Sequence, residues 1–167
     1  MSQTIAKKAV LIVRAFADRG WRVALAESCT GGLVAAALTE IPGSSAVVER
    51  GFVTYSNEAK AEMLGIDPAL IATHGAVSQP VARAMAEGAL AASPADVTVA
   101  ITGIAGPGGG SAAKPVGLVH LACATRGLPC EHLERRYGDL GRAAVRERAV
   151  EDALTLLEDA LRPRLEA

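Results

Sequence analysis

The stretch Ala26-Glu27-Ser28-Cys29-Thr30-Gly31-Gly32 joins a short apolar run to a helical pattern of small residues. A strand is therefore expected to pass into a helix here, with two adjacent candidate nucleophiles, Ser28 and Cys29, at the junction. The start of a helix offers unpaired backbone N–H groups and the positive end of the helix dipole, which suit an oxyanion or a bound anion. The commoner explanation of such a stretch is that Ser28 or Thr30 caps the helix and that the glycines only shape a turn.

The length and composition favour one α/β domain over the whole chain, residues 1–167. A chain of 167 residues is long enough for a single domain with a proper core. Half of the residues are hydrophobic but only 3% are aromatic, so Ala, Val, Leu and Ile must build the core. Side chains of this size allow helices to pack closely on a sheet.

The charge and the cysteines exclude several classes of protein. The net charge is -1 and there is no run of like charges, so the general electrostatic signature of a nucleic-acid binder is missing. No apolar run approaches the ~20 residues of a membrane span, and no signal-cleavage pattern follows the N-terminus. Cys29, Cys123 and Cys130 lack paired metal-ligand spacing, which predicts reduced thiols and no metal site. We expect a soluble cytoplasmic protein.

Helical and extended patterns alternate along the chain. Helices are expected at about 4–19, 33–40, 58–64, 68–74 and 78–92 and from 139 onward, and strands at 21–26, 47–55, 95–102, 115–125 and 131–137. Asn57 is expected to cap the third helix. The last two strands form a hairpin across the turn at 127–129, whereas the earlier alternation favours parallel pairing. The expected fold is a single-domain three-layer α/β/α sandwich with a mixed sheet.

Four loops are expected to gather at strand ends, namely 28–32, 55–60, 76–79 and 102–110. In open α/β sheets the crevice beyond the carboxyl ends of the strands is the usual ligand site. The fourth loop is rich in glycine but lacks the Gly-Lys-Ser ending of a nucleoside-triphosphate P-loop. It either presents backbone N–H groups to a single phosphate or simply turns the chain.

A serine nucleophile needs a base, and the chain offers histidine or lysine for this role. His74, His120 and His132 fall at a helix end, in a strand and in the hairpin, where structural roles are commoner. Lys60 follows a strand at the start of a helix, where partial desolvation would lower its pKa. Tyr55 would relay a proton or donate to a developing oxyanion. From the residues alone, the commoner explanation of Lys60 is a solvated surface lysine.

Two further groups have competing explanations. Cys29 is the rival nucleophile, because a thiol reacts well and a helix N-terminus lowers its pKa, but cysteine is also a common buried residue. Arg142 and Arg146 are four residues apart, hence on one helix face, where they would clamp a phosphate or simply lie exposed.

Five motifs occur in order along the chain. They are AESCTGG at 26–32, GFVTYSNEAK at 51–60, HGAVS at 74–78, TGIAGPGGG at 102–110 and KPVGLV at 114–119. Together they resemble the CinA C-terminal domain family of nicotinamide mononucleotide deamidases. The similarity runs from about Thr4 to Leu161. The larger CinA proteins carry an extra N-terminal domain for which this chain has no room, so we expect the stand-alone form.

The resemblance implies hydrolysis of the carboxamide of nicotinamide mononucleotide to nicotinate mononucleotide and ammonia, a step of pyridine-nucleotide salvage that uses no cofactor. It implies Ser28 as nucleophile, Lys60 as base and Tyr55 as assisting residue. The expected substrate-binding residues are Thr30, Gly31, Thr102, Gly103, Gly106, Arg142 and Arg146. The expected partners are a pyridine mononucleotide and further copies of the chain. The alternative is a non-catalytic nucleotide-binding or interaction module in a competence or DNA-damage response.

Overall fold

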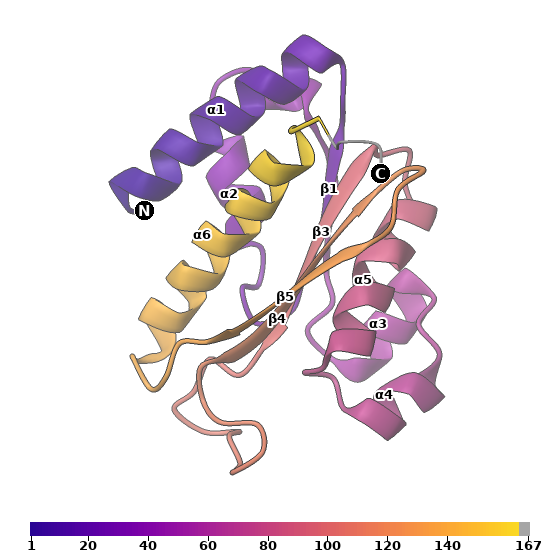
Figure 1. Cartoon of the computed structure of the whole chain (residues 1–167), viewed down its shortest axis with the longest axis vertical. Helices are drawn as coiled ribbons and strands as arrows, with labels where there is room; N and C mark the ends of the chain where they lie inside the picture. Colours follow the sequence, from indigo (N-terminus) through magenta and orange to yellow (C-terminus); the bar gives the residue numbers. More distant parts are fainter. Residues whose placement is uncertain (164–167) are drawn as a thin grey trace.

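The computed structural model of the protein describes residues 1–163 and contains one five-stranded sheet covered by helices (Figure 1). The strands are β1 (Val23–Glu27), β2 (Val48–Val53), β3 (Val97–Gly103), β4 (Leu118–Thr125) and β5 (Glu131–Arg136). The helices are α1 (Gln3–Arg19), α2 (Leu33–Thr39), α3 (Asn57–Leu64), α4 (Pro68–His74), α5 (Gln79–Ala91) and α6 (Arg142–Ala160), with a 3-10 turn at Ser44–Ala46. The predicted α/β class is confirmed.

The sheet is mixed, as predicted, with the strand order β2-β1-β3-β4-β5. β1 pairs in parallel with both β2 and β3. The connections from β1 to β2 and from β2 to β3 each contain at least one helix, and they are long enough to bring the chain back to the end of the sheet where the previous strand began. β4 pairs antiparallel with β3 and with β5, and the short turn after β4 allows only the antiparallel pairing.

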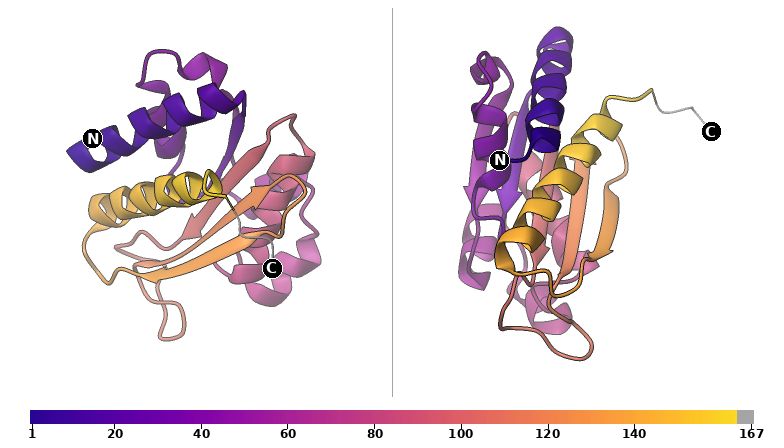
Figure 2. Two further views of the ribbon diagram at one scale, coloured as in Figure 1. Left: turned by 45° about the horizontal axis from the view of Figure 1, so that its top comes forward. Right: turned by 90° about the vertical axis from the view of Figure 1, so that its left-hand side faces the viewer.

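The helices form two layers on opposite faces of the sheet. α1, α2 and α6 cover one face, on the left in Figure 1, and α3, α4 and α5 cover the other, on the right. Seen from the left-hand side of that view, α1 and α6 lie in front of the sheet (Figure 2). Alternation along β3 divides its side chains between the layers: Val99 and Ile101 pack with the α1 and α6 side, and Ala100 packs with the α5 side. The three-layer α/β/α arrangement is confirmed.

Several element boundaries differ from the sequence-based expectation by up to three residues, and the starts of α3, β4 and α6 are examples. Ser56, and not Asn57, caps α3, because its extended backbone lets Oγ accept from the Ala59 N–H at 3.0 Å, and Asn57 is already helical. β4 begins three residues later than expected, because the chain still turns at Gly117, whose φ is +90°. α6 begins at Arg142 and not at 139. No helix in residues 1–163 has the length and apolar character needed to cross a membrane.

The N-terminus of α2 is closed by the carboxylate of Glu27, the last residue of β1. Its Oε1 accepts from the Val34 N–H at 2.9 Å and its Oε2 from the Ala35 N–H at 3.1 Å. The residue at the cap position is Gly32, which has no side chain to contribute. The explanation that Ser28 or Thr30 caps this helix is therefore wrong, because a buried carboxylate takes the free amides of the first turn.

We expect Glu27→Ala to lower the free energy of unfolding by about 1–3 kcal/mol, because the variant leaves two buried amides without acceptors. Urea unfolding at neutral pH measures the change. Glu27→Gln is the matched control, since it keeps one acceptor oxygen and is expected to lose less. An alanine variant as stable as the original protein would contradict the capping role.

Candidate active site

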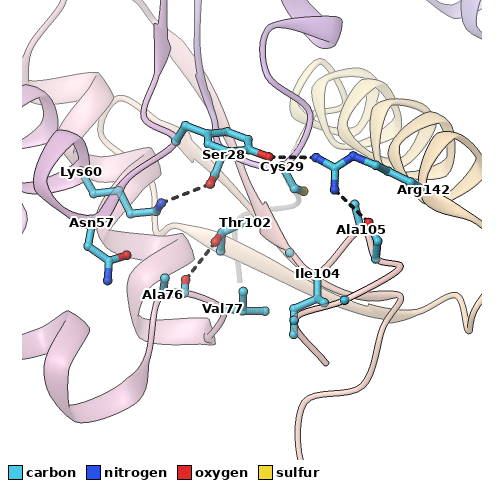
Figure 3. Close-up of a pocket in the computed structure, with 15 residues that line it drawn as sticks. Ser28, Cys29, Asn57, Lys60, Ala76, Val77, Thr102, Ile104, Ala105 and Arg142 are labelled. Carbon is cyan, nitrogen blue, oxygen red and sulfur yellow. Dashed lines mark hydrogen bonds between the residues drawn. The ribbon is translucent and has the colours of Figure 1, made fainter. Parts of the chain in front are cut away.

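A pocket of about 290 Å³ lies beyond the carboxyl ends of β1 and β3. All four loops that were expected to converge contribute to its wall, and Figure 3 shows their side chains meeting there. Of the sequence-predicted site residues, the pocket is lined by Ser28, Tyr55, Lys60, Thr102, Gly103, Gly106 and Arg142. The structure does not bring Thr30, Gly31 and Arg146 to the pocket wall.

Ser28 and Lys60 form a buried pair at the base of the pocket. Lys60 Nζ lies 3.1 Å from Ser28 Oγ (Figure 3). It also donates to the Thr54 carbonyl at 2.9 Å. Ser28 directly follows β1, and Lys60 lies in the first turn of α3, which crosses the same end of the sheet. Lys60 is only 1% exposed, so the explanation that it is a solvated surface lysine is wrong.

Burial lowers the pKa of the Lys60 amine, because the charged form loses its hydration. No carboxylate in the described part of the chain compensates this charge. A neutral amine has two N–H groups and one lone pair. If the Thr54 carbonyl accepts one N–H, the lone pair is available to accept the Ser28 hydroxyl proton, and the carbonyl thereby orients the base.

The histidines do not take part in this pair. His120 Nδ1 lies 2.9 Å from His132 Nε2 and the two rings are stacked. His74 ends α4, and its backbone carbonyl accepts from Lys114 Nζ at 2.6 Å. Within residues 1–163 no histidine lines the pocket or hydrogen-bonds Ser28. Their placement agrees with structural roles.

Cys29 lines the pocket but is poorly suited to attack. Burial raises the pKa of its thiol to about 11. The expectation that a helix N-terminus lowers this pKa is wrong here, because desolvation outweighs the other influences and Glu27 occupies the first-turn amides of α2. At neutral pH the sulfur is therefore protonated and a weak nucleophile.

We expect the Cys29 thiol of the folded protein to react with iodoacetamide about 100-fold more slowly than in the unfolded chain. The reason is that a pKa of about 11 in place of 9.0 lowers the thiolate fraction by that factor. Peptide mapping by mass spectrometry after timed alkylation measures each cysteine separately. Equal rates in the folded and the urea-unfolded protein would show that the thiolate is accessible after all.

Arg142 crosses the mouth of the pocket. Its guanidinium donates to the Tyr55 hydroxyl and to the Gly106 carbonyl, both at 2.9 Å (Figure 3). It thus connects α6 to the loop after β2 and to the glycine-rich loop. A guanidinium has five N–H groups, and these two bonds leave three for a ligand. The site therefore presents a positive charge that an anion can bind bidentately.

Arg146 shares a helix face with Arg142, as the spacing predicted, but reaches different partners. Its Nε donates to the Cys29 carbonyl at 3.0 Å and its Nη2 to the Thr30 carbonyl at 3.2 Å. The paired phosphate clamp is therefore not formed in this structure.

Sequence reasoning missed two contributions to the site. Asn57 lines the pocket and lies three residues before Lys60, so the helical spacing within the motif could have indicated it. The Thr54 carbonyl that orients Lys60 left no signal, because every residue has a backbone carbonyl. Among residues 1–163 there is no group of three or more His, Cys, Asp and Glu side chains arranged to hold a metal ion.

The fold and the site define an α/β protein with a buried serine–lysine pair at the carboxyl ends of the strands of a mixed sheet. The chain belongs to the CinA C-terminal domain family, which matches residues 5–161. This confirms the family that the five motifs indicated.

Relatives and solved structures agree with this membership. A CinA-like protein of Anaeromyxobacter dehalogenans (strain 2CP-1) is 56% identical over 153 residues, which are 91% of this chain and 37% of that protein. A putative competence-damage inducible protein of Symbiobacterium thermophilum is 53% identical over 86% of this chain and 35% of its own length. The chain thus spans little more than a third of the length of these curated relatives.

Two crystal structures have nearly the same fold over nearly their whole length. The competence/damage inducible protein CihA of Agrobacterium tumefaciens has a TM-score of 0.94 at 55% identity, over 96% of this chain and 97% of its own. A CinA superfamily protein of Klebsiella pneumoniae 700603 has a TM-score of 0.88 at 38% identity, over 94% of this chain and 97% of its own.

Proposed function

We propose that the chain hydrolyses the carboxamide of nicotinamide mononucleotide and releases nicotinate mononucleotide and ammonia. The observation that carries the proposal is the buried Lys60 amine 3.1 Å from the Ser28 hydroxyl in a pocket. An amide is a poor electrophile. Its hydrolysis needs an activated nucleophile, donors for the oxyanion and a proton for the departing amine.

In the first half of the reaction, Lys60 Nζ takes the Ser28 proton as Oγ attacks the carboxamide carbon. The Thr54 carbonyl accepts from the ammonium that forms. Lys60 then gives its proton to the leaving nitrogen, the C–N bond breaks, and ammonia departs from a nicotinoyl ester of Ser28. In the second half a water molecule attacks this ester and Lys60 takes a proton from it. The bond between the carbonyl carbon and Ser28 Oγ then breaks, Lys60 returns the proton to Oγ, and the nicotinate carboxyl group is released.

The phosphate of the substrate is assigned to Arg142 and the glycine-rich loop. Arg142 has N–H groups to spare beyond its bonds to Tyr55 and Gly106, and the pocket wall includes Gly103 and Gly106. Tyr55, held by Arg142 at the pocket mouth, is proposed to assist at the reacting carboxamide. Thr102 Oγ donates to the Ala76 carbonyl at 2.9 Å, which fixes its orientation in the pocket.

A second candidate is a nucleotide-binding module without catalysis in a competence or DNA-damage response. The names of relatives favour it, since they refer to competence and damage. The catalytic proposal is preferred, because burying an amine without a counter-charge costs free energy and needs a reason that a binding module does not supply.

The proposal is tested with chelator-treated wild-type protein and nicotinamide mononucleotide, following ammonia enzymatically and nicotinate mononucleotide by chromatography. The expected result is equimolar formation of the two products. Nicotinamide riboside, which lacks the phosphate, is the matched substrate and should turn over much more slowly. Saturable binding without any product would overturn the proposal in favour of the binding module, and neither binding nor turnover would overturn both candidates.

A further inference from the structure

Arg146 holds the backbone of the turn that carries the serine nucleophile. It lies one helical turn after Arg142 on α6, and its guanidinium bonds two successive carbonyls, those of Cys29 and Thr30. These contacts join parts of the chain that are 117 and 116 residues apart in the sequence. Arg146 is therefore a tertiary clamp on the turn between β1 and α2.

Arg146 holds the carbonyl of Cys29, the residue whose N–H directly follows the nucleophile in the chain. In a trans peptide the C=O and the N–H point in opposite directions. Holding the Cys29 carbonyl thus aims the Thr30 N–H away from Arg146. The Gly31 N–H is used within the turn, where it donates to the Ser28 carbonyl at 3.0 Å. The Cys29 and Thr30 N–H groups donate to no other residue in the described part of the chain.

Within the turn, the Gly31 N–H donates to the Ser28 carbonyl and the Leu33 N–H to the Thr30 carbonyl, and Arg146 adds two bonds from outside it. Gly31 has φ +59° and Gly32 has φ +106°, and glycine is the residue that loses the most conformational freedom when it is ordered. Glu27 secures the end of the turn at α2. A Cβ on Gly31 would lie 3.5 Å from Arg146 Nη2, which shows how closely the guanidinium follows the backbone here.

We propose that Arg146 is a positioning residue that holds the turn 28–31 so that the amide of Cys29, which lines the pocket, binds the oxyanion formed when Ser28 attacks. The N–H directly after a serine nucleophile is a common oxyanion donor. Removing one such donor typically lowers kcat by about 10²- to 10³-fold. The inference rests on the nucleophile of the proposed function but does not depend on the identity of the substrate.

The test compares Arg146→Ala and Arg146→Lys with Arg148→Ala, an exposed arginine of the same helix. One readout is kcat and KM for nicotinamide mononucleotide. The other is the rate at which a fluorophosphonate labels Ser28. In this step the Oγ–P bond forms, Lys60 takes the hydroxyl proton and fluoride leaves. The phosphoryl oxygen of the probe occupies the position of the oxyanion.

We expect Arg146→Ala to lower both kcat and the labelling rate by about 10²-fold while KM changes by less than about threefold. Arg146→Lys, which can still reach one carbonyl, should have an intermediate kcat and labelling rate. Added guanidinium ion should restore part of the labelling rate of Arg146→Ala. Arg148→Ala should match the wild type. If Arg146→Ala does not show a cooperative thermal transition, the lysine variant decides in its place.

A raised KM with unchanged kcat and labelling rate would overturn the inference and make Arg146 a substrate-binding residue. Unchanged values throughout, or a wild type whose Ser28 is not labelled, would overturn it as well. If the wild type does not hydrolyse nicotinamide mononucleotide but the labelling rate falls in Arg146→Ala, the proposed function fails and the positioning role stands.

Discussion

Ser28→Ala is expected to lower kcat for nicotinamide mononucleotide by about 10⁴- to 10⁶-fold, the range seen when a serine nucleophile is removed from a hydrolase. The variant loses the atom that forms the covalent bond, and the Cys29 thiol beside it is protonated and cannot replace it. Ammonia release under substrate saturation measures the effect. Thermal unfolding is expected to change little, because the one hydrogen bond that Ser28 Oγ makes within residues 1–163 is to Lys60.

Ser44→Ala is the matched control for this experiment. Ser44 is buried to nearly the same degree, 9% exposed against 8%, but lies in the 3-10 turn before β2, at the opposite end of the sheet from the pocket. The Ser44→Ala variant should therefore have the same kcat as the wild type. If Ser28→Ala retained activity within about tenfold of the wild type, a serine nucleophile would be excluded and a directly attacking water would replace it.

Lys60→Met is expected to lower kcat by at least about 10³-fold without lowering the free energy of unfolding. Methionine keeps an unbranched stem of similar length but removes the amine that lies 3.1 Å from the Ser28 hydroxyl and is proposed as its base. Because burial disfavours the charged amine, its removal should leave the folded state as stable or more stable. Ammonia release and urea unfolding measure the two effects separately, and Lys7→Met, at an exposed position of α1, is the control.

The lowered pKa of Lys60 also fixes the sign of two pH effects. Activity requires the neutral amine, so kcat/KM of the wild type should fall as the pH falls through the lowered pKa of the folded protein. Between this pKa and the ordinary lysine value of about 10.4, the unfolded chain binds one proton more than the folded one, so stability rises with pH. Lys60→Met should lose this contribution. An identical pH dependence of stability in the wild type and the variant would contradict the lowered pKa of Lys60.

Much of the fold followed from local patterns. The strand expected at 95–102 is β3, and the helices expected at 4–19 and 58–64 end at Arg19 and Leu64, each before a glycine with a left-handed φ of 66°. The hairpin of β4 and β5 followed from two extended patterns separated by a short turn. These signals are readable because periodicity and turn chemistry depend on residues close together in the chain.

The site was predictable only in part. Motif positions identified Ser28, Tyr55 and Lys60, all of which line the pocket. The two arginines of α6, in contrast, were indistinguishable by spacing, and only the packing of α6 against the turn after β1 separates the role of Arg146 from that of Arg142.

The sequence by itself determined the order and type of the elements, the mixed sheet and the loops that meet at its carboxyl ends. The tertiary structure alone decided that Lys60 is buried against a serine 32 residues away, that Cys29 is protonated, and that Glu27 caps α2. The physical reason is that a pKa and an unpaired amide depend on which atoms exclude water from them. Those atoms come from distant parts of the chain, and their proximity is fixed only when the layers pack.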